Sequence, residues 1–178
     1  MHLTPRSYRQ MPWANGRGAT TQLYRADDAD GKLLWRISMA MVVEDGAFSV
    51  FAGMDRSLTL ISGPEFDLVG PGIALHLAPL APVAFPGDAE IRATGVLGPS
   101  SDFNVISNRL RIDQRVWVSD PGVLDLAGEI GALFMLEPGS LAVGDALVQA
   151  GRHDLLITDQ PVRVTTRAAL IAVELRFR

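Results

Sequence analysis

Turn-forming residues interrupt this chain at short intervals along its whole length. Its 178 residues include 17 glycines and 11 prolines, which are spread from one end to the other. Glycine supplies positive backbone φ angles, and proline neither continues a helix nor donates to a strand ladder, so both residues favour turns. Few windows of a dozen residues lack such a signal, and long helices are therefore hard to place. The chain is expected to fold into short β-strands.

Short apolar or alternating runs lie between these turns. Runs of this length and spacing are typical of a β-sandwich or barrel. The residues are 48% hydrophobic, which is enough to close a substantial core. The predicted strands are 33–41, 57–61, 66–69, 74–77, 132–136, 140–143, 146–148, 154–157 and 168–177.

The turns between these runs suggest an internal repeat. Pro138-Gly139 and Gly144-Asp145 separate three runs in the second half, which predicts a β-meander. Residues 62–64 and 70–72 separate three runs in the same way in the first half. Two successive jelly-roll-like barrels would produce such a repeat, because closure protects strand edges. The fold class predicted is thus all-β with little helix.

The division between the two halves is expected near residues 110–120. This gives an N-terminal half of residues 1–112 and a C-terminal half of residues 113–178, between which strands could be exchanged. Only residues 107–115 and 123–131 leave room for a short helix or a connecting segment.

Charge and composition argue against several classes of function. The net charge is -4 and no run of Lys or Arg forms a basic stripe, so no nucleic-acid partner is expected. The chain has no cysteine, which excludes disulfides and thiolate chemistry and fits a reducing cytoplasm. No stretch approaches the roughly 18 apolar residues of a membrane helix, and the first residues lack the apolar segment of a secretory signal. A cytoplasmic protein without a membrane partner is expected.

Motifs for metal binding and for nucleophilic catalysis are absent from the sequence. The three histidines, His2, His76 and His153, are widely spaced and form no H-x-H pair, so no metal site is expected. No nucleophile elbow, P-loop or dinucleotide fingerprint is present, so no cofactor is expected. Enzymatic activity is therefore unsupported by any motif.

The segment 11–21 has the composition of a binding loop. Trp13 offers a flat apolar wall, Asn15 offers a donor and an acceptor, and Gly16 allows close approach of the backbone to a ligand. The alternative is a loop that plugs one end of a barrel with Trp13 in the core.

A second candidate lies on the strand that contains Trp35. Period-two alternation places Arg36 and Ser38 on the face opposite Trp35. If that face lines a cavity, a buried Arg36 would suit a carboxylate ligand, which it can grip with two hydrogen bonds. The commoner alternative is an arginine on the solvent face of a barrel strand.

Three further segments place polar groups beside aromatic ones. Residues 44–57 include Ser49, Phe51 and Arg56, and the favoured reading of Asp55 beside Arg56 is a structural ion pair. Residues 85–88 and 101–104 each set an acid next to an aromatic residue at a strand edge. They could rim a pocket or cap a turn, and turns have the better prior.

The motifs in the first half recur in the same order in a known family. They are Met11-Pro12-Trp13, Asn15-Gly16, Gly18, Thr20, Trp35-Arg36-Ile37-Ser38, Asp45-Gly46, Phe48-Ser49, Phe51, Gly53, Asp55-Arg56, Phe85, Gly87-Asp88 and Asp102-Phe103-Asn104. Over roughly residues 5–110 the chain resembles the HutD/Ves family. Two positions depart from the family pattern, where this chain has Ala14 and Arg17. Arg17 could contact a carboxylate or point to solvent, which leaves the identity of the ligand open.

The resemblance implies a double cupin fold, or bicupin, that lacks the usual metal and has its pocket in the first half. It also implies a role beside histidine-utilisation enzymes, in which the protein binds N-formylglutamate or a related acid and so limits flux. The leading hypothesis is therefore a metal-independent binding or regulatory protein for a small carboxylate-bearing metabolite. A homodimer is possible because cupin-like barrels often pair.

Under this hypothesis the candidate site residues have distinct roles. Arg36 and Arg56 hold the carboxylate, other side chains fix polar atoms, and aromatic rings supply apolar walls. The full set is Trp13, Asn15, Gly16, Arg36, Ser38, Ser49, Phe51, Arg56, Phe85, Asp88, Asp102, Phe103 and Asn104. The rival hypothesis is an isomerase or hydrolase that uses Asp88 or Asp102 as a general base. A third is a scaffold that acts through its surface.

Overall fold

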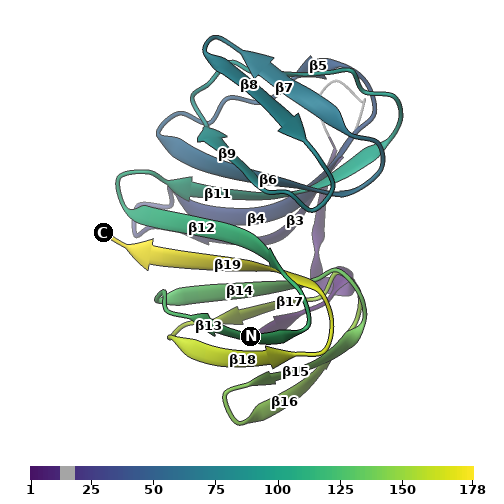
Figure 1. Ribbon diagram of the computed structural model, residues 1–178. Coiled ribbons are helices and arrows are strands. Elements are labelled where there is room, and N and C mark those ends of the chain that lie inside the picture. The colour runs from purple at the N-terminus through teal and green to yellow at the C-terminus, as the bar shows by residue number, and fades with distance from the viewer. Residues whose placement is uncertain (13–18) are drawn as a thin grey trace. The chain divides into compact units, whose positions relative to one another are not determined.

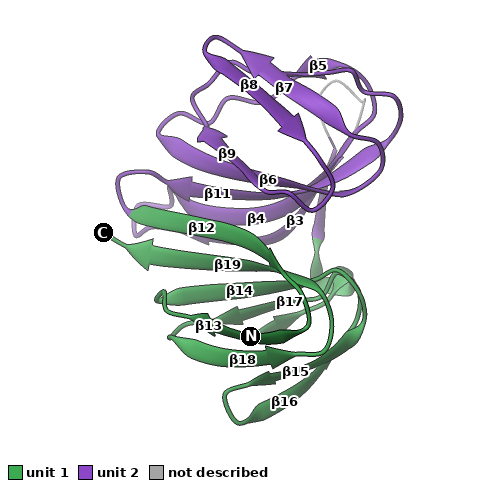
Figure 2. Ribbon diagram, viewed as in Figure 1, with its two compact units in different colours: residues 1–8, 112–178 green, residues 9–111 purple. Residues whose placement is uncertain are grey.

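The computed structural model describes residues 1–12 and 19–178, and nearly all of its regular structure is β-strand (Figure 1). The exception is a short 3-10 turn, η1, at Pro5–Ser7. No helix among the described residues is long and apolar enough to cross a membrane. The chain forms two compact units, residues 9–111 and residues 1–8 with 112–178 (Figure 2).

The unit of residues 9–111 consists of two antiparallel sheets. The six-stranded sheet has the order β2-β3-β4-β11-β6-β9, and the four-stranded sheet has the order β5-β10-β7-β8. An apolar cluster joins the two sheets, with Leu58 and Leu60 from one and Phe66 and Leu68 from the other. The strands are β2 (Arg9–Pro12), β3 (Ala19–Asp27), β4 (Leu33–Val42), β5 (Gly46–Ala47), β6 (Met54–Ser62), β7 (Phe66–Gly70), β8 (Ile73–Leu77), β9 (Val83–Pro86), β10 (Arg92–Thr94) and β11 (Ser100–Asn108).

The second unit is built in the same way. Its sheets have the orders β1-β17-β14-β19-β12 and β13-β18-β15-β16. The first residues belong here because β1 pairs with β17, and the amino terminus of Met1 donates to the Ile157 carbonyl at 2.7 Å. The strands are β1 (His2–Leu3), β12 (Ile112–Ser119), β13 (Gly122–Leu126), β14 (Ile130–Met135), β15 (Gly139–Val143), β16 (Ala146–Ala150), β17 (Leu155–Thr158), β18 (Val162–Thr166) and β19 (Leu170–Phe177).

The two units repeat one strand order. The order β4-β11-β6-β9 recurs as β12-β19-β14-β17, and β5-β10-β7-β8 recurs as β13-β18-β15-β16. The predicted internal repeat is thus confirmed, and it extends along the chain from β4 to β19. Each half has the two-sheet jelly-roll architecture of a cupin.

The predicted meanders are wrong at one connection in each half. The hairpins β7–β8 and β15–β16 form as expected. However, β6 and β7 lie in different sheets, and so do β14 and β15. The chain crosses from one sheet to the other at Gly63-Pro64 in the first half and at Pro138 in the second. At the first crossing Gly63 takes a φ of 94°. A Gly-Pro dipeptide predicts that the chain changes direction. It does not predict whether the following strand pairs with the preceding one or joins the other sheet.

The two segments expected to hold a short helix or a connection contain no helix, and in each a short connection lies between strand residues. Residues 123–131 contain most of β13, a connection at 127–129 and the start of β14, and residues 107–115 contain the end of β11, a turn at 109–111 and half of β12. Both β11 and β12 pair along most of their length with strands distant in sequence.

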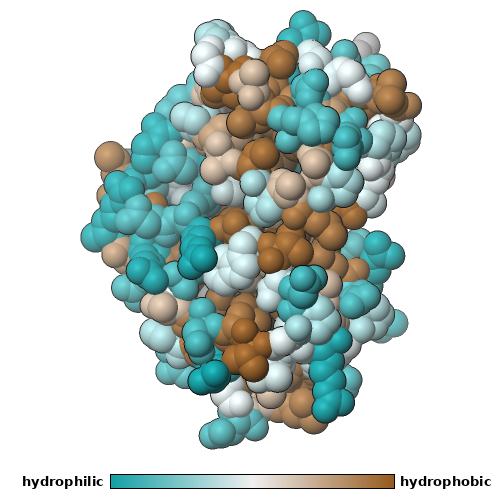
Figure 3. Space-filling view, in the orientation of Figure 1, coloured by the Kyte–Doolittle hydropathy of each residue, from teal (hydrophilic) through white to brown (hydrophobic). Residues whose placement is uncertain are grey.

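On the face seen in Figure 3, apolar and polar side chains are interspersed.

Candidate functional site

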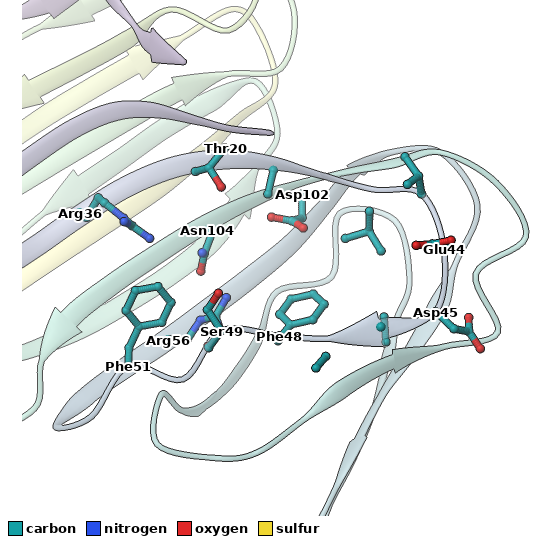
Figure 4. Close-up of a pocket in the computed structure, with 16 residues that line it drawn as sticks. Thr20, Arg36, Glu44, Asp45, Phe48, Ser49, Phe51, Arg56, Asp102 and Asn104 are labelled. Atoms are coloured by element: carbon teal, nitrogen blue, oxygen red, sulfur yellow. The ribbon is translucent and has the colours of Figure 1, made fainter. Parts of the chain in front are cut away.

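A cavity of about 520 Å³ lies within the unit of residues 9–111 (Figure 4). Arg36, Arg56, Asp102 and Asn104 gather at one end of it. The lining continues along the segment 42–49, whose Glu44 and Asp45 lie at the end away from Arg36. The cavity therefore has a buried, polar inner end and an acidic outer end.

Strand register explains why the inner polar residues face the same way. Directly paired residues of adjacent strands point to the same side of a sheet. Asp102 of β11 pairs with Ala40 of β4 and Leu60 of β6. Asn104 pairs in turn with Ser38 and Leu58. Because Leu58 and Leu60 belong to the apolar core between the sheets, Asp102 and Asn104 face the inside of the unit as well.

Arg56 is buried against aromatic rings. Its side chain is 4% exposed, and its Cζ lies 5.0 Å from the centre of the Phe85 ring, 5.2 Å from that of Phe51 and 5.4 Å from that of Phe48. Its Nη1 donates to the Ser49 carbonyl at 3.2 Å. Burial lowers the pKa of Arg56 to about 10, an effect that the charge of Asp102 opposes. The guanidinium therefore stays charged at neutral pH, and a desolvated cation over a ring gains about 2 kcal/mol.

Arg36 is the second buried guanidinium. It is 8% exposed and its Cζ lies 5.1 Å from the centre of the Phe51 ring. Burial lowers the pKa of Arg36, and the nearby charge of Arg25 acts in the same direction. The Nε atoms of Arg36 and Arg56 are both buried and have no acceptor among the described residues.

Asp102 is the buried acid of the cavity. It is 1% exposed, and burial raises the pKa of its carboxyl to about 7, against the opposing effects of the Arg56 charge and the Ala40 amide. Neither carboxylate oxygen completes a hydrogen bond of good geometry in the described part of the chain, and the same holds for Asn104 Oδ1 and Ser38 Oγ. A buried polar group left unpaired costs about 1–3 kcal/mol, so a cluster of them calls for an explanation, such as a ligand.

The structure brings together most of the candidate residues that it describes. Ser38 is the strand partner of Asn104, and Phe85 packs on Arg56. Trp13, Asn15 and Gly16 lie outside the described residues. The candidates that line the cavity itself are Arg36, Ser49, Phe51, Arg56, Asp102 and Asn104.

Phe103 and Asp88 do not line the cavity. Phe103 alternates with Asp102 along β11, so its fully buried ring is on the opposite face of the sheet. Asp88 accepts hydrogen bonds from the Gly53 amide and from Arg109 Nη1, the latter at 2.6 Å. The Arg109 contact lowers the pKa of Asp88, so this carboxylate is committed to holding a turn.

The ion pair expected between Asp55 and Arg56 is also wrong. Asp55 Oδ1 accepts from Arg109 Nε at 2.6 Å, whereas Arg56 points into the cavity. Adjacent strand residues face opposite sides, which separates the two side chains. Arg109 also donates to the Met54 carbonyl at 2.6 Å, so it ties the start of β6 to the turn that follows β9.

Sequence reasoning missed several residues of the site. Phe48, Glu44 and Asp45 line the cavity, and the density of aromatic, acidic and glycine residues in 44–57 was the available signal. Arg109 gave no local signal, because both of its acidic partners are far away in sequence.

The donor set of the cavity does not fit the metal that cupins commonly hold. Of the described residues, two guanidiniums and one carboxylate lie at the inner end, and no histidine is among those that line the cavity. His76 hydrogen-bonds to Asp67 and Glu65 and is not among the lining residues, and His2, in the other unit, hydrogen-bonds to Asp154. Within residues 1–12 and 19–178, no group of three or more His, Asp or Glu is placed to hold a metal ion.

The second unit has an apolar interior at the corresponding strands. Where β11 places Asp102 and Asn104 inside, the inward positions of β19 that pair with β14 and β12 carry Leu170 and Ala172. Both are fully buried in a cluster with Leu133 and Met135. Among the described residues, the cavity lined by Arg36, Arg56, Asp102 and Asn104 lies in the first copy of the repeat.

Two successive jelly rolls, the first with a polar ligand-sized cavity, define a bicupin. Among solved structures, a Cupin 2 conserved barrel domain protein from Leptotrichia buccalis shares the fold, with a TM-score of 0.56 at 7% identity over 91% of this chain and 89% of that one. The HutD family model matches residues 5–172, so the chain belongs to the HutD family.

Individual relatives agree with this assignment. Protein Ves of Citrobacter koseri is 33% identical over 160 residues, which cover 83% of each protein. HutD from Pseudomonas fluorescens SBW25 is 30% identical with a TM-score of 0.87, covering 100% of this chain and 98% of that one. The conserved protein PA5104 from Pseudomonas aeruginosa PAO1 is 31% identical with a TM-score of 0.88, covering 99% and 98%.

Proposed function

We propose that the protein binds a small carboxylate-bearing metabolite in the cavity of residues 9–111, without a metal, and acts as a regulatory binding protein. The observation that carries the proposal is the pair of buried guanidiniums, Arg36 and Arg56, whose Nε atoms lack an acceptor among the described groups. A buried arginine is costly unless an anion pairs with it, and its fork of donors matches a carboxylate.

The size and shape of the cavity support the proposal. About 520 Å³ lies within the usual range of small-molecule pockets, roughly 300–1,000 Å³. Phe48 and Phe51 supply apolar walls beside the guanidiniums, and Asn104 offers a hydrogen-bond acceptor. Membership of the HutD family supports a link to histidine utilisation, and N-formylglutamate or a related intermediate is the ligand we propose first.

Ligand-induced thermal stabilisation tests this function. A ligand that binds only the folded state at 100 times its Kd adds about 2.7 kcal/mol, which raises the Tm of a chain of this length by several degrees. We expect N-formyl-L-glutamate to raise the Tm of the wild type and to have no effect on Arg36→Gln. Arg163→Gln is the matched control, since Arg163 is exposed on β18. Equal stabilisation of all three proteins would refute the assigned pocket.

An enzyme remains a second candidate because of Asp102. A buried carboxyl with a pKa raised to about 7 is suited to proton transfer at neutral pH. Asp88, the other candidate base, is held by Arg109 and Gly53 outside the cavity. Incubation with histidine-pathway intermediates, followed by mass spectrometry, tests this function. Turnover by the wild type that Asp102→Asn abolishes would favour the enzyme over the binding protein.

A further inference from the structure

We propose that binding of an anionic ligand in the cavity is accompanied by protonation of Asp102, so that affinity for the anion depends on this one carboxyl. The inference rests on the proposed function, because it concerns the same cavity. Asp102 is a positioning and charge-setting residue in this account, and the two arginines make the main contacts.

The Asp102 carboxyl is buried without a well-formed hydrogen bond among the described residues. It is 1% exposed, and neither of its oxygens has such a bond. Most buried carboxylates are fixed by donors, and such donors would keep the group ionised. Here no described donor makes a well-formed hydrogen bond to the carboxylate, and the nearby guanidinium charge of Arg56 and the Ala40 amide favour its ionised form less than burial opposes it.

Few charged groups face Asp102 from the part of the lining that the structure describes. The strands on either side of β11 contribute Arg36 from β4 and Arg56 from β6. Thr20 of β3 and the alanines of β5 and β10 are uncharged. The remaining acids of the lining, Glu44 and Asp45, lie at the outer end (Figure 4).

The net charge at the inner end of the cavity determines the electrostatic environment of a bound ligand. With Asp102 ionised, the two guanidiniums and one carboxylate of the described lining leave a single positive charge. A ligand carboxylate that reaches the guanidiniums therefore enters beside another carboxylate in a poorly solvated space. Like charges at close range favour protonation of one of them, as in paired-carboxylate sites.

The step is a simple acid–base exchange. One proton passes from a buffer acid to a carboxylate oxygen of Asp102, where an O–H bond forms, and the buffer is left as its conjugate base. The neutral Asp102 no longer repels the ligand and gains a donor for a ligand oxygen. Since the pKa of this carboxyl is already raised to about 7 by burial, the proton is available near neutral pH.

Calorimetry in two buffers measures the proton directly. N-formyl-L-glutamate is titrated into the wild type at pH 8 in HEPES and in Tris, whose ionisation enthalpies differ. We expect the observed heat to differ between these two buffers by an amount equal to uptake of about half to one proton. At pH 5.5, in MES and in Bis-Tris, the corresponding difference should be close to zero. Above the pKa of the free site the Kd should rise up to tenfold per pH unit.

Two variants sharpen the result. Asp102→Asn should bind without proton uptake and with a Kd that changes little between pH 6 and 8.5. His76→Gln, which alters an exposed titratable group on β8, should behave as the wild type. The wild-type measurement stands even if Asp102→Asn folds poorly.

The outcomes separate this inference from the proposed function. Binding by the wild type without proton exchange at pH 8 would overturn the inference and leave the function intact, because Asp102 would then stay ionised and accept a donor from the ligand. Absence of any binding heat at either pH would overturn the proposed function, and the inference with it.

Discussion

The guanidinium carbon of Arg56 lies 5.0 Å from the centre of the Phe85 ring, where most buried arginines would instead have a hydrogen-bonded carboxylate. Aromatic faces thus hold the charge without neutralising it. Because no described acid hydrogen-bonds to Arg56 Nε, the charge remains directed at the cavity.

Replacing the supporting ring should weaken the site. Phe85→Leu removes one of the faces that hold Arg56 and is expected to cost about 1–2 kcal/mol of stability and to raise the Kd for N-formyl-L-glutamate. Phe66→Leu is the control, since Phe66 is equally buried in the same apolar cluster. Urea unfolding and calorimetry should show similar losses of stability but a loss of affinity only for Phe85→Leu. An equal loss of affinity in both variants would contradict the role of the ring.

The stability of the unliganded protein should depend on Asp102 in a defined pH window. Burial raises the pKa of this carboxyl from 3.8 to about 7, so between these values the folded protein holds a proton that the unfolded chain has released. Its contribution to stability therefore falls as pH rises from about 4 to 7 and is constant above that.

Asp102→Asn removes that titration. Its stability relative to the wild type should improve by on the order of 2 kcal/mol between pH 5 and 8, measured by urea unfolding. Asp113→Asn is the control, because Arg178 lowers the pKa of Asp113, so that this group stays ionised through the window. A constant difference for Asp102→Asn across this range would show that the carboxyl titrates elsewhere.

A methyl group at position 87 should disturb the turn that carries Phe51. A Cβ at Gly87 would lie 2.8 Å from the carbonyl oxygens of Phe51 and Met54, and backbone atoms cannot yield cheaply. We expect Gly87→Ala to lose about 1–3 kcal/mol and to bind more weakly. At Gly98 the nearest atom would be Pro64 Cγ at 3.7 Å, an ordinary contact, so Gly98→Ala should leave binding unchanged. Wild-type affinity in Gly87→Ala would show that the turn adapts.

The Arg109 contacts should matter to stability more than an ordinary surface pair does. Arg109 reaches Asp55, Asp88 and the Met54 carbonyl, each at 2.6 Å. Arg109→Gln should therefore lower the Tm by on the order of 3 °C, with a smaller effect on affinity than Arg36→Gln. Arg163→Gln, from a pair separated by 3.8 Å, should lower it much less. Equal Tm values for the two variants would count against an anchoring role.

Much of the fold was predictable because its signals are local. The β7–β8 and β15–β16 hairpins each have glycine-containing turns between alternating runs, and the structure confirms them. The crossings after β6 and β14 were missed because the same residues mark a hairpin turn and a change of sheet. Which of the two occurs depends on pairing with strands distant in sequence.

The site was predictable to the extent that strand alternation determines it. Alternation placed Arg36 and Ser38 together, and the structure has both buried on the inner face. Strand alternation could also have excluded Phe103 from the candidate site residues, since Asp102, Phe103 and Asn104 cannot all face one cavity. Arg109 could not have been found, because its partners meet it only after the sheets assemble.

The two copies of the jelly roll allow an internal comparison, because the same strands carry apolar residues in one copy and polar residues in the other. The second copy fills its interior with Leu170 and Ala172, and the first copy has Asp102 and Asn104 on the matching strands. Natural proteins often retain a less stable arrangement where function requires it. A chain carrying Asp102→Leu with Asn104→Ala should therefore resist denaturation better than its parent above pH 7, where Asp102 is ionised, so the polar pair of the first copy would be kept at a cost in stability.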